Sequence, residues 1–330
     1  MKTNKIYGIL LIICLLVLMV NTGVCQQSKI DNIVFATGAA NGTWWIIGAG
    51  IAEKANEFFQ GFPITAIPGP GSVGNPPLVS KGEAFLGMSY PPFLILAREG
   101  KGPYDQTFTN LRSVCTLTPT VVHIFADEKI DVTTVDELID QKIKITMGVP
   151  PTGQGSNYIT KIIFSAMGYD NLEEIEKWGS KIYYADGDGL VSGWRDRHIN
   201  VLIQTLNVPA SAVTESLTSR KGKILSFGDK LMDELVVNRG FSKFIIPAST
   251  YPDQEKDIST VALPIVVFTR DDVPEDIIYN IVKSIYENKD YLIKVHNSFE
   301  SFDPKQMASG LGIQLHKGAE KFYKEVGLIK

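Results

Sequence analysis

The chain has 330 residues, which is long for a single core, so we predict two domains of ordinary size. Its composition, with 44% hydrophobic and 21% charged residues, is typical of a globular protein. The formal net charge is −4 and no basic stripe appears, which makes nucleic acid and anionic membrane surfaces poor partners.

Residues 1–25 read as an export signal. Lys2 and Lys5 precede an apolar run from Ile6 to Val20, which is too short for a hydrocarbon core of about 30 Å. Cys25 stands where a bacterial lipoprotein would be acylated, although cleavage to a free soluble protein is the alternative. We expect an extracytoplasmic protein without an internal disulfide, because Cys115 is the only other cysteine after the signal.

The first predicted unit is a buried strand at 33–36, a loop of small residues and an amphipathic helix that carries Trp44, Ile47, Ile51 and Ala55. Such a loop brings unpaired backbone N–H groups and the positive end of the helix dipole to one point. That combination suits an anion.

A second strand, at 64–67, leads into Gly69, Gly71 and Gly74. These glycines fit G-x-G-x-x-G, but Pro70 lies inside the motif and no acidic residue follows at the expected spacing, so a dinucleotide site is not expected. We predict a glycine turn that opens a short helix and exposes backbone donors of Gly71 and Ser72.

The next predicted strand, at 85–88, ends in the hydroxyl pair Ser89 and Tyr90, and a short helix follows at 93–97. The apolar segment 111–125 is long for one strand and could pass from one lobe to the other. Thr134 is predicted to cap a helix, with Glu137 three positions on.

The segment 143–167 repeats the first scheme. An apolar strand runs into a turn with Thr152, Gly153, Gly155 and Ser156, and a helix follows. The apolar segment 265–269 is predicted to cross back, and helices are expected at 275–287 and 319–326. Two such units predict two α/β lobes that face one cleft.

The sequence gives little support for a metal site, a nucleotide site or a catalytic site. The four histidines are scattered, and neither G-x-S-x-G nor a Walker motif occurs. Asp186 and Asp188, placed between glycines, read as a solvated turn rather than as a catalytic pair. Of Trp44 and Trp45, at most one is expected to face the cleft, with the other in the core.

The ordered set FATGAANGTWW, GPGSVGN, KGEAFLGMS, TMGVPPTGQGS, FIIPASTYPDQEKDISTVALP and QLHKGAEKFYKEVG resembles the TAXI family of extracytoplasmic solute receptors of TRAP transporters. The resemblance implies a type II periplasmic-binding-protein fold with lobe 1 at 30–122 plus 262–330 and lobe 2 at 123–261. It also implies a small carboxylate ligand such as glutamate or 2-oxoglutarate, no cofactor, no catalysis, and delivery to a sodium-coupled TRAP permease.

By position in the family, the ligand-binding residues are expected in four loops: Thr37, Asn41, Gly42, Thr43, Trp44, Gly71, Ser72, Ser89, Tyr90, Thr152, Gly153, Gly155 and Ser156. Trp44 replaces the family's usual tyrosine, so the identity of the ligand is open. We expect a monomer that closes on its ligand by a hinge at the two crossing segments. A sensor input or surface lipoprotein of the same fold, or less readily an enzyme, are the alternatives.

Overall fold

The computed structural model describes residues 32–40, 42–59 and 63–330, and within this range the strands form one ten-stranded sheet. The predicted signal, Cys25 and Asn41 lie outside the described residues. No helix in the described ranges is both long enough and apolar enough to cross a membrane.

The first half of the sheet consists of three consecutive strand-helix units. β1 pairs in parallel with β2 and with β3, so the carboxyl ends of the three strands meet at one edge. The elements are β1 (Ile33–Ala36), α2 (Thr43–Ala55), η1 (Asn56–Phe58), β2 (Ile64–Ile67), α3 (Gly71–Ser80), β3 (Leu86–Ser89) and α4 (Pro91–Glu99).

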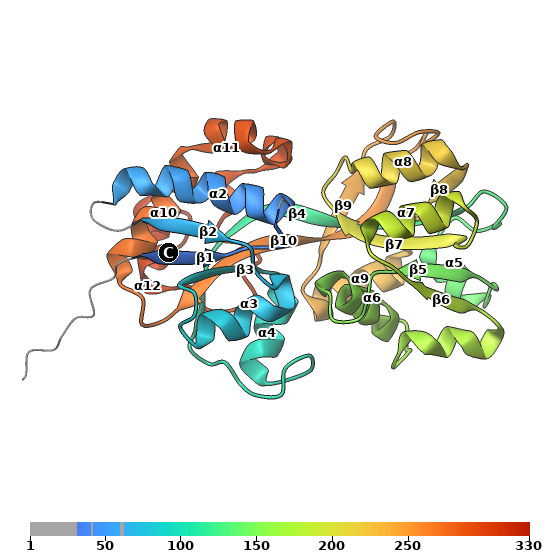
Figure 1. The fold of residues 1–330 in the computed structure, drawn as a ribbon, viewed down its shortest axis with the longest axis horizontal. Helices are drawn as coiled ribbons and strands as arrows, with labels where there is room; N and C mark the ends of the chain where they lie inside the picture. Colours follow the sequence, from blue (N-terminus) through green and yellow to red (C-terminus); the bar gives the residue numbers. More distant parts are fainter. Residues whose placement is uncertain (1–31, 41, 60–62) are drawn as a thin grey trace, which may run out of the picture. The chain divides into compact units, whose positions relative to one another are not determined.

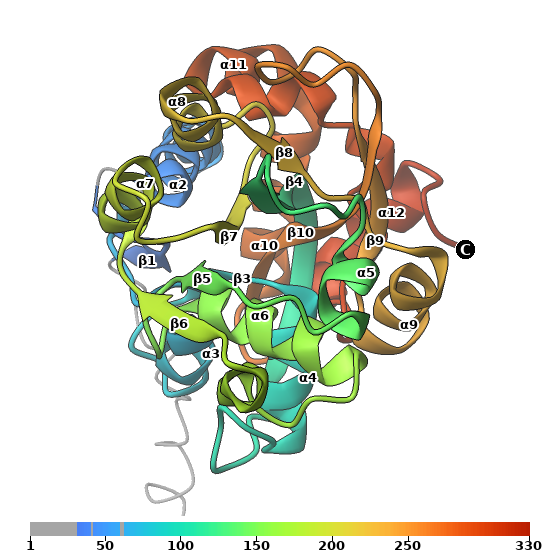
Figure 2. The same cartoon turned by 90° about the vertical axis from the view of Figure 1, so that its right-hand side faces the viewer.

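The second half repeats this topology. β5 pairs in parallel with β6 and β7, and the strand order β6-β5-β7 mirrors β2-β1-β3 of the first half. Figure 2 faces this half of the protein. Its elements are α5 (Val135–Asp140), β5 (Thr146–Val149), α6 (Gly155–Ala166), η2 (Leu172–Trp178), β6 (Lys181–Tyr184), α7 (Gly187–Arg195), β7 (Val201–Leu206), α8 (Ser211–Ser219), β8 (Gly222–Ile224), α9 (Asp229–Arg239) and β9 (Ser242–Ile246).

Two long strands, β4 (Leu111–Asp127) and β10 (Ile258–Arg270), belong to both halves (Figure 1). β4 pairs with β10 and, from Val121 to Ala126, with β7. β10 pairs with β9 at its start and with β3 at Val266 to Thr269. The prediction of two α/β lobes joined by crossing strands is therefore confirmed.

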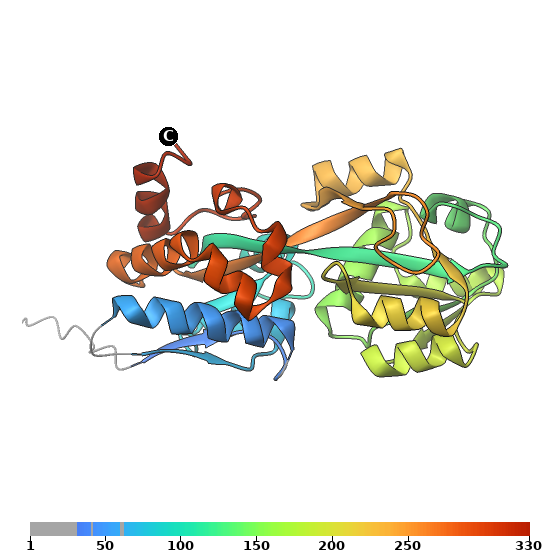
Figure 3. The same ribbon diagram turned by 90° about the horizontal axis from the view of Figure 1, so that it is seen from above.

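The C-terminal helices pack on the first half. α10 and α11 contact α2, and α12 contacts α10, as Figure 3 shows from above. The elements are α10 (Glu275–Glu287), α11 (Lys289–Val295), η3 (Asn297–Ser301), η4 (Pro304–Gln306) and α12 (Lys317–Glu325).

Most predicted elements are confirmed, and the exceptions have local causes. α4 begins at Pro91 rather than Phe93, because proline is accepted at the first helical positions. The predicted solvated turn at Asp186 and Asp188 is confirmed in its exposure, but the turn is the start of a helix. The Asp186 carboxylate accepts from Gly189 N at 2.9 Å and caps α7, which was not predicted. The prediction that Trp44 or Trp45 is a core residue is also wrong, since both are half-buried.

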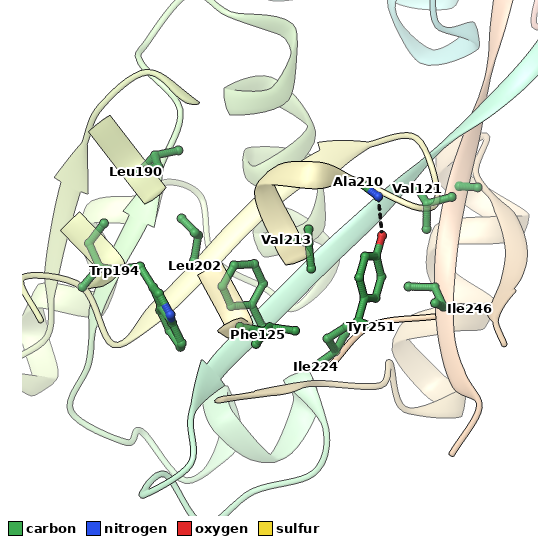
Figure 4. Packing of buried hydrophobic residues seen from close by; sticks show 13 residues of the cluster. Val121, Phe125, Leu190, Trp194, Leu202, Ala210, Val213, Ile224, Ile246 and Tyr251 are labelled. Carbon is green, nitrogen blue, oxygen red and sulfur yellow. Dashed lines mark hydrogen bonds between the residues drawn. The ribbon is translucent and has the colours of Figure 1, made fainter. Parts of the chain in front are cut away.

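The core of the second half is a cluster in which Trp194 is fully buried and lies 4.9 Å from Phe125, between ring centroids (Figure 4). At its edge, Tyr251 Oη accepts a hydrogen bond from Ala210 N at 3.0 Å. Tyr251 also donates to His123 Nε2 at 2.8 Å, since His123 Nδ1 donates to Val121 O at 3.0 Å. Burial lowers the pKa of His123 from 6.5 to about 4.

The segment STYPDQ, residues 249–254, is the loop that holds Tyr251. Gln254 Nε2 donates to the carbonyls of Ile246, Pro247 and Lys256, and Gln254 Oε1 accepts from Tyr251 N at 3.1 Å. This loop therefore fixes the core of the second half and the start of α8.

Candidate functional site

The candidate site is defined by helices that begin where parallel strands end. α2, α3 and α4 follow β1, β2 and β3, while α6, α7 and α8 follow β5, β6 and β7. In open α/β sheets, ligands bind outside the carboxyl ends of the strands. Each helix start also presents backbone N–H groups that have no partner within the helix.

One of these six starts is capped by a side chain, one begins with two prolines, and at a third a buried hydroxyl binds the N–H just before the helix. Asp186 caps α7, and Tyr251 Oη accepts from Ala210 N at the start of α8. Pro91 and Pro92 begin α4 and have no N–H to offer.

The other three starts, of α2, α3 and α6, remain open. Within the described residues, none of them has a side-chain cap or an acidic residue in its first turn. By contrast, α5 is closed by a full capping box of Thr134 and Glu137. The positive ends of α2, α3 and α6 are thus uncompensated, which favours an anion near them.

The starts of α3 and α6, which come from different halves, touch each other. A Cβ atom on Gly155 would lie 2.0 Å from Ser72 Oγ and 3.7 Å from Phe93 Cε2. The ring of Phe93 lies 6.2 Å from that of Tyr158, between centroids. Glycine at 155 is therefore what permits this close approach.

Buried hydrogen bonds hold the loops of the first half in place. Asn75, which is fully buried, donates to Ala36 O, Thr37 O and Met88 O at 3.2, 2.8 and 2.8 Å. Thr37 Oγ1 donates to Ile67 O at 2.8 Å, and Ser89 Oγ donates to Ser72 O at 2.6 Å. The ends of β1, β2 and β3 and the start of α3 are thereby fixed to one another.

Two of the buried polar atoms that lack a hydrogen-bond partner in the described part of the protein belong to Asn157, in the first turn of α6, and to Tyr104. Asn157 Nδ2 donates to Pro150 O at 2.9 Å, but Asn157 Oδ1 is unpaired. The hydroxyl of Tyr104, a residue only 8% exposed, is also unpaired. Burial and the nearby Tyr158 hydroxyl raise the pKa of Tyr104, so it stays a neutral donor.

The predicted site residues differ in exposure. Thr152 and Gly153 are exposed, and Gly42, Thr43, Trp44, Gly71, Gly155 and Ser156 are half-buried. Thr37, Ser72, Ser89 and Tyr90 are buried. The hydroxyls of Thr37 and Ser89 are engaged inside the first half, so any contribution of these two to ligand binding remains a prediction.

The structure brings several predicted residues together. Ser72 meets Gly155 and Ser89, and the rings of Trp44 and Tyr90 pack edge to face at 5.0 Å. Burial raises the pKa of Tyr90 to about 12. Sequence reasoning missed Asn75 and Asn157. The only sequence feature that could have indicated them is an amide side chain in the early turns of a helix whose other residues are small or apolar.

Two further observations concern other kinds of site. Among the described residues, no group of three or more His, Cys, Asp or Glu side chains is placed to hold a metal ion. A cavity of about 610 Å³ lies between α5, α6 and α9 and is lined by Ala166, Met167 and Gly168 at the far end of α6. It is therefore separate from the helix starts described above.

Comparison with known proteins gives a family and a fold. The model of the NMT1-like family matches residues 35–327. The periplasmic binding protein BugD aligns with 90% of this chain and 98% of its own at 14% identity, with a TM-score of 0.51.

Two other solved structures are similar to a comparable degree. A TctC solute binding protein from Polaromonas matches over 90% of this chain and 98% of its own, at 14% identity and a TM-score of 0.52. MatC from Rhodopseudomonas palustris, with bound malate, matches over 90% and 96% at 12% identity and a TM-score of 0.52. The predicted fold class, that of periplasmic binding proteins, is confirmed.

Proposed function

Since this chain belongs to the NMT1-like family, we propose that it is an extracytoplasmic solute-binding receptor that captures a small carboxylate for transport. The observation that carries the proposal is the set of three open helix starts, of α2, α3 and α6, contributed by both halves of the sheet. The two-lobed fold shared with BugD, TctC and MatC supports it.

The energetics favour a ligand held from both sides. Removing a carboxylate from water costs several kcal/mol. An open helix start contributes about 0.3–2 kcal/mol, and each charge-assisted hydrogen bond about 1.5–3 kcal/mol. One helix start alone is therefore insufficient, whereas donors from α2, α3 and α6 together exceed the cost.

Because one helix start cannot offset the cost of removing the carboxylate from water, the two lobes are expected to close on the ligand. We propose that a ligand bound to one lobe selects a state in which the loops at 37–43 and 152–156 both reach it. The hinge lies in the crossing strands β4 and β10. The proposed lobes are 30–122 plus 262–330 and 123–261.

The composition of the loops supports a receptor rather than an enzyme. The segments 37–45, 68–80, 89–97 and 150–160 contain no Asp, Glu, Lys, Arg, His or Cys. General acid-base or nucleophilic catalysis needs such groups near the substrate. A receptor needs only donors and a shaped surface.

The finer assignment follows the sequence resemblance. We propose that the receptor belongs to the TAXI type, that it delivers its ligand to a sodium-coupled TRAP permease, and that it acts as a monomer. Residues 1–25 serve as the export signal in this proposal, and acylation of Cys25 would anchor the mature protein at a membrane surface.

A thermal-shift screen of the mature protein tests the proposal. The probes are amino acids, dicarboxylates, keto acids and aromatic acids, with the matching amides as uncharged controls. A ligand at a hundredfold excess over its Kd stabilises the folded state by about 2.7 kcal/mol, which is readily measured. We expect one class of acid to stabilise the protein and to be recovered unchanged. Stabilisation by amides and acids alike, or chemical conversion of the acid, would refute the proposal.

A further inference from the structure

Aromatic side chains line the helix starts of the candidate site in a continuous series. Trp44 lies in the first turn of α2, Tyr90 and Phe93 lie at the start of α4, and Tyr158 lies in the first turn of α6. Successive ring centroids are 5.0, 6.3 and 6.2 Å apart. These separations are within the range of attractive aromatic contacts, so the four rings form one aromatic series across both halves.

The series passes directly beside the open start of α6. Phe93 Cε2 lies 3.7 Å from the position of a Cβ on Gly155, and Phe93 itself is fully buried. A carboxylate held by the first amides of α6 would thus have an aromatic ring as its immediate neighbour. Of the four rings, Trp44 and Tyr158 are half-buried and can face a ligand, whereas Tyr90 and Phe93 are buried and pack against them.

Charged side chains are scarce along the same surface. The four segments that supply the helix starts contain no Lys, Arg or His, and Lys81, Arg98 and Lys161 follow directly after three of them. Of these three cations, Lys161 comes soonest after the start of its helix. Its Nζ lies 5.3 Å from the centroid of the Tyr158 ring. One carboxylate can be compensated by the helix starts, but a second would depend on Lys161 alone.

The unpaired Asn157 Oδ1 in the first turn of α6 points to a ligand with a hydrogen-bond donor near its acid. Asn157 Oδ1 and Tyr104 Oη are both buried without a partner among the described residues. An isolated buried polar atom is costly unless something hydrogen-bonds it. A ligand with a hydroxyl group next to the carboxylate can donate such a bond to Asn157 Oδ1, in the first turn of α6.

We propose, on the basis of the receptor function proposed above, that the ligand is a monocarboxylate with an aromatic body, and that Phe93 and Tyr158 determine this preference. The carboxylate lies at the open starts of α3 and α6, and the ring packs on the aromatic series. Glutarate and similar dicarboxylates bind more weakly, because their second charge meets rings instead of donors.

The experiment compares phenylpyruvate and phenylacetate with 2-oxoglutarate and glutarate by isothermal titration of the mature protein. We expect the aryl acids to bind at least about tenfold more tightly than the diacids. The variants Phe93→Leu and Tyr158→Leu should each weaken the aryl acids by roughly tenfold. Phe299→Leu, an equally buried ring that packs against Phe302, is the matched control and should leave the affinity unchanged.

The outcomes separate this inference from the receptor proposal. Tighter binding of the diacids, lost in Lys161→Gln, would overturn the aromatic preference and leave a carboxylate receptor. Unchanged aryl affinity in folded Tyr158→Leu, a half-buried position that tolerates substitution better than Phe93, would also overturn it. Failure of all four acids to bind would overturn the aromatic preference, whereas the receptor proposal falls only if no acid of the thermal-shift screen binds.

Discussion

Replacing Gly155 by alanine tests whether the contact between the two halves belongs to the ligand-bound state. The new Cβ would lie 2.0 Å from Ser72 Oγ and 3.3 Å from Ser72 Cβ, so either Ser72 or the lobes must move. Overpacking of this kind costs about 1–3 kcal/mol. If that cost falls only on the closed state, the apparent Kd rises roughly 5- to 150-fold.

The assay is isothermal titration with the acid that gives the largest thermal shift, combined with urea unfolding. Gly155 is the first residue of α6, where alanine suits the helix, so the free energy of unfolding should not fall. Gly187→Ala is the matched control, because Gly187 also begins a helix of the second half and its Cβ would meet nothing within 4 Å. Adding Ser72→Ala removes the atom at 2.0 Å and should restore most of the affinity.

A folded Gly155→Ala protein that binds as tightly as the wild type would refute this reasoning. It would show that α3 and α6 need not meet when the ligand is held. The start of α6 would then be an unlikely part of the binding site, and donors from one half would have to suffice.

Three further predictions concern stability, measured by urea unfolding. The pKa of His123 is lowered to about 4 from 6.5, so the unfolded chain binds more protons below pH 6.5 and stability falls from there toward pH 4. Relative to His123→Gln, the wild type should lose about 2 kcal/mol between pH 7 and pH 5, and an equal pH dependence would contradict the buried neutral state. Arg220→Met should lower the free energy of unfolding by about 3–5 kcal/mol, because it leaves the buried Asp127 carboxylate without its charged partner. The side chains of Arg220 and Asp127 are only 7% and 8% exposed. The more exposed Arg239→Met should cost less than about 1 kcal/mol, and equal costs would refute the argument. Asn75→Ala should cost about 2–4 kcal/mol, because three carbonyls lose their donor, and a change below about 1 kcal/mol would show that these bonds contribute little.

The sequence predicts well where local physics decides. Thr134 and Glu137 form the capping box that their spacing indicates, and the strand at 33–36 and the helix at 275–287 have the predicted bounds. The apolar runs at 111–125 and 265–269, which become parts of β4 and β10, are also recognisable in the sequence because they are continuously apolar.

Prediction fails where a local signal is weak or has two meanings. The glycines around Asp186 read as a turn, because glycine disfavours helix, yet Asp186 caps α7 and Trp194 anchors it in the core. Trp44 and Trp45 look like one pocket residue and one core residue, but α2 buries Ile47 and Ile51 instead and leaves both indoles half-buried.

By itself, the sequence determined the two strand-loop-helix schemes, the crossing strands and the uncharged, glycine-rich character of the four loops, because these depend on neighbours along the chain. Only the tertiary structure decided which helix starts stay open and which meet. Tyr251 binds Ala210 N just before α8 from a distant loop, and Ser72 touches Gly155 across the two halves. Such contacts depend on the packing of segments far apart in the chain, which local sequence patterns do not encode.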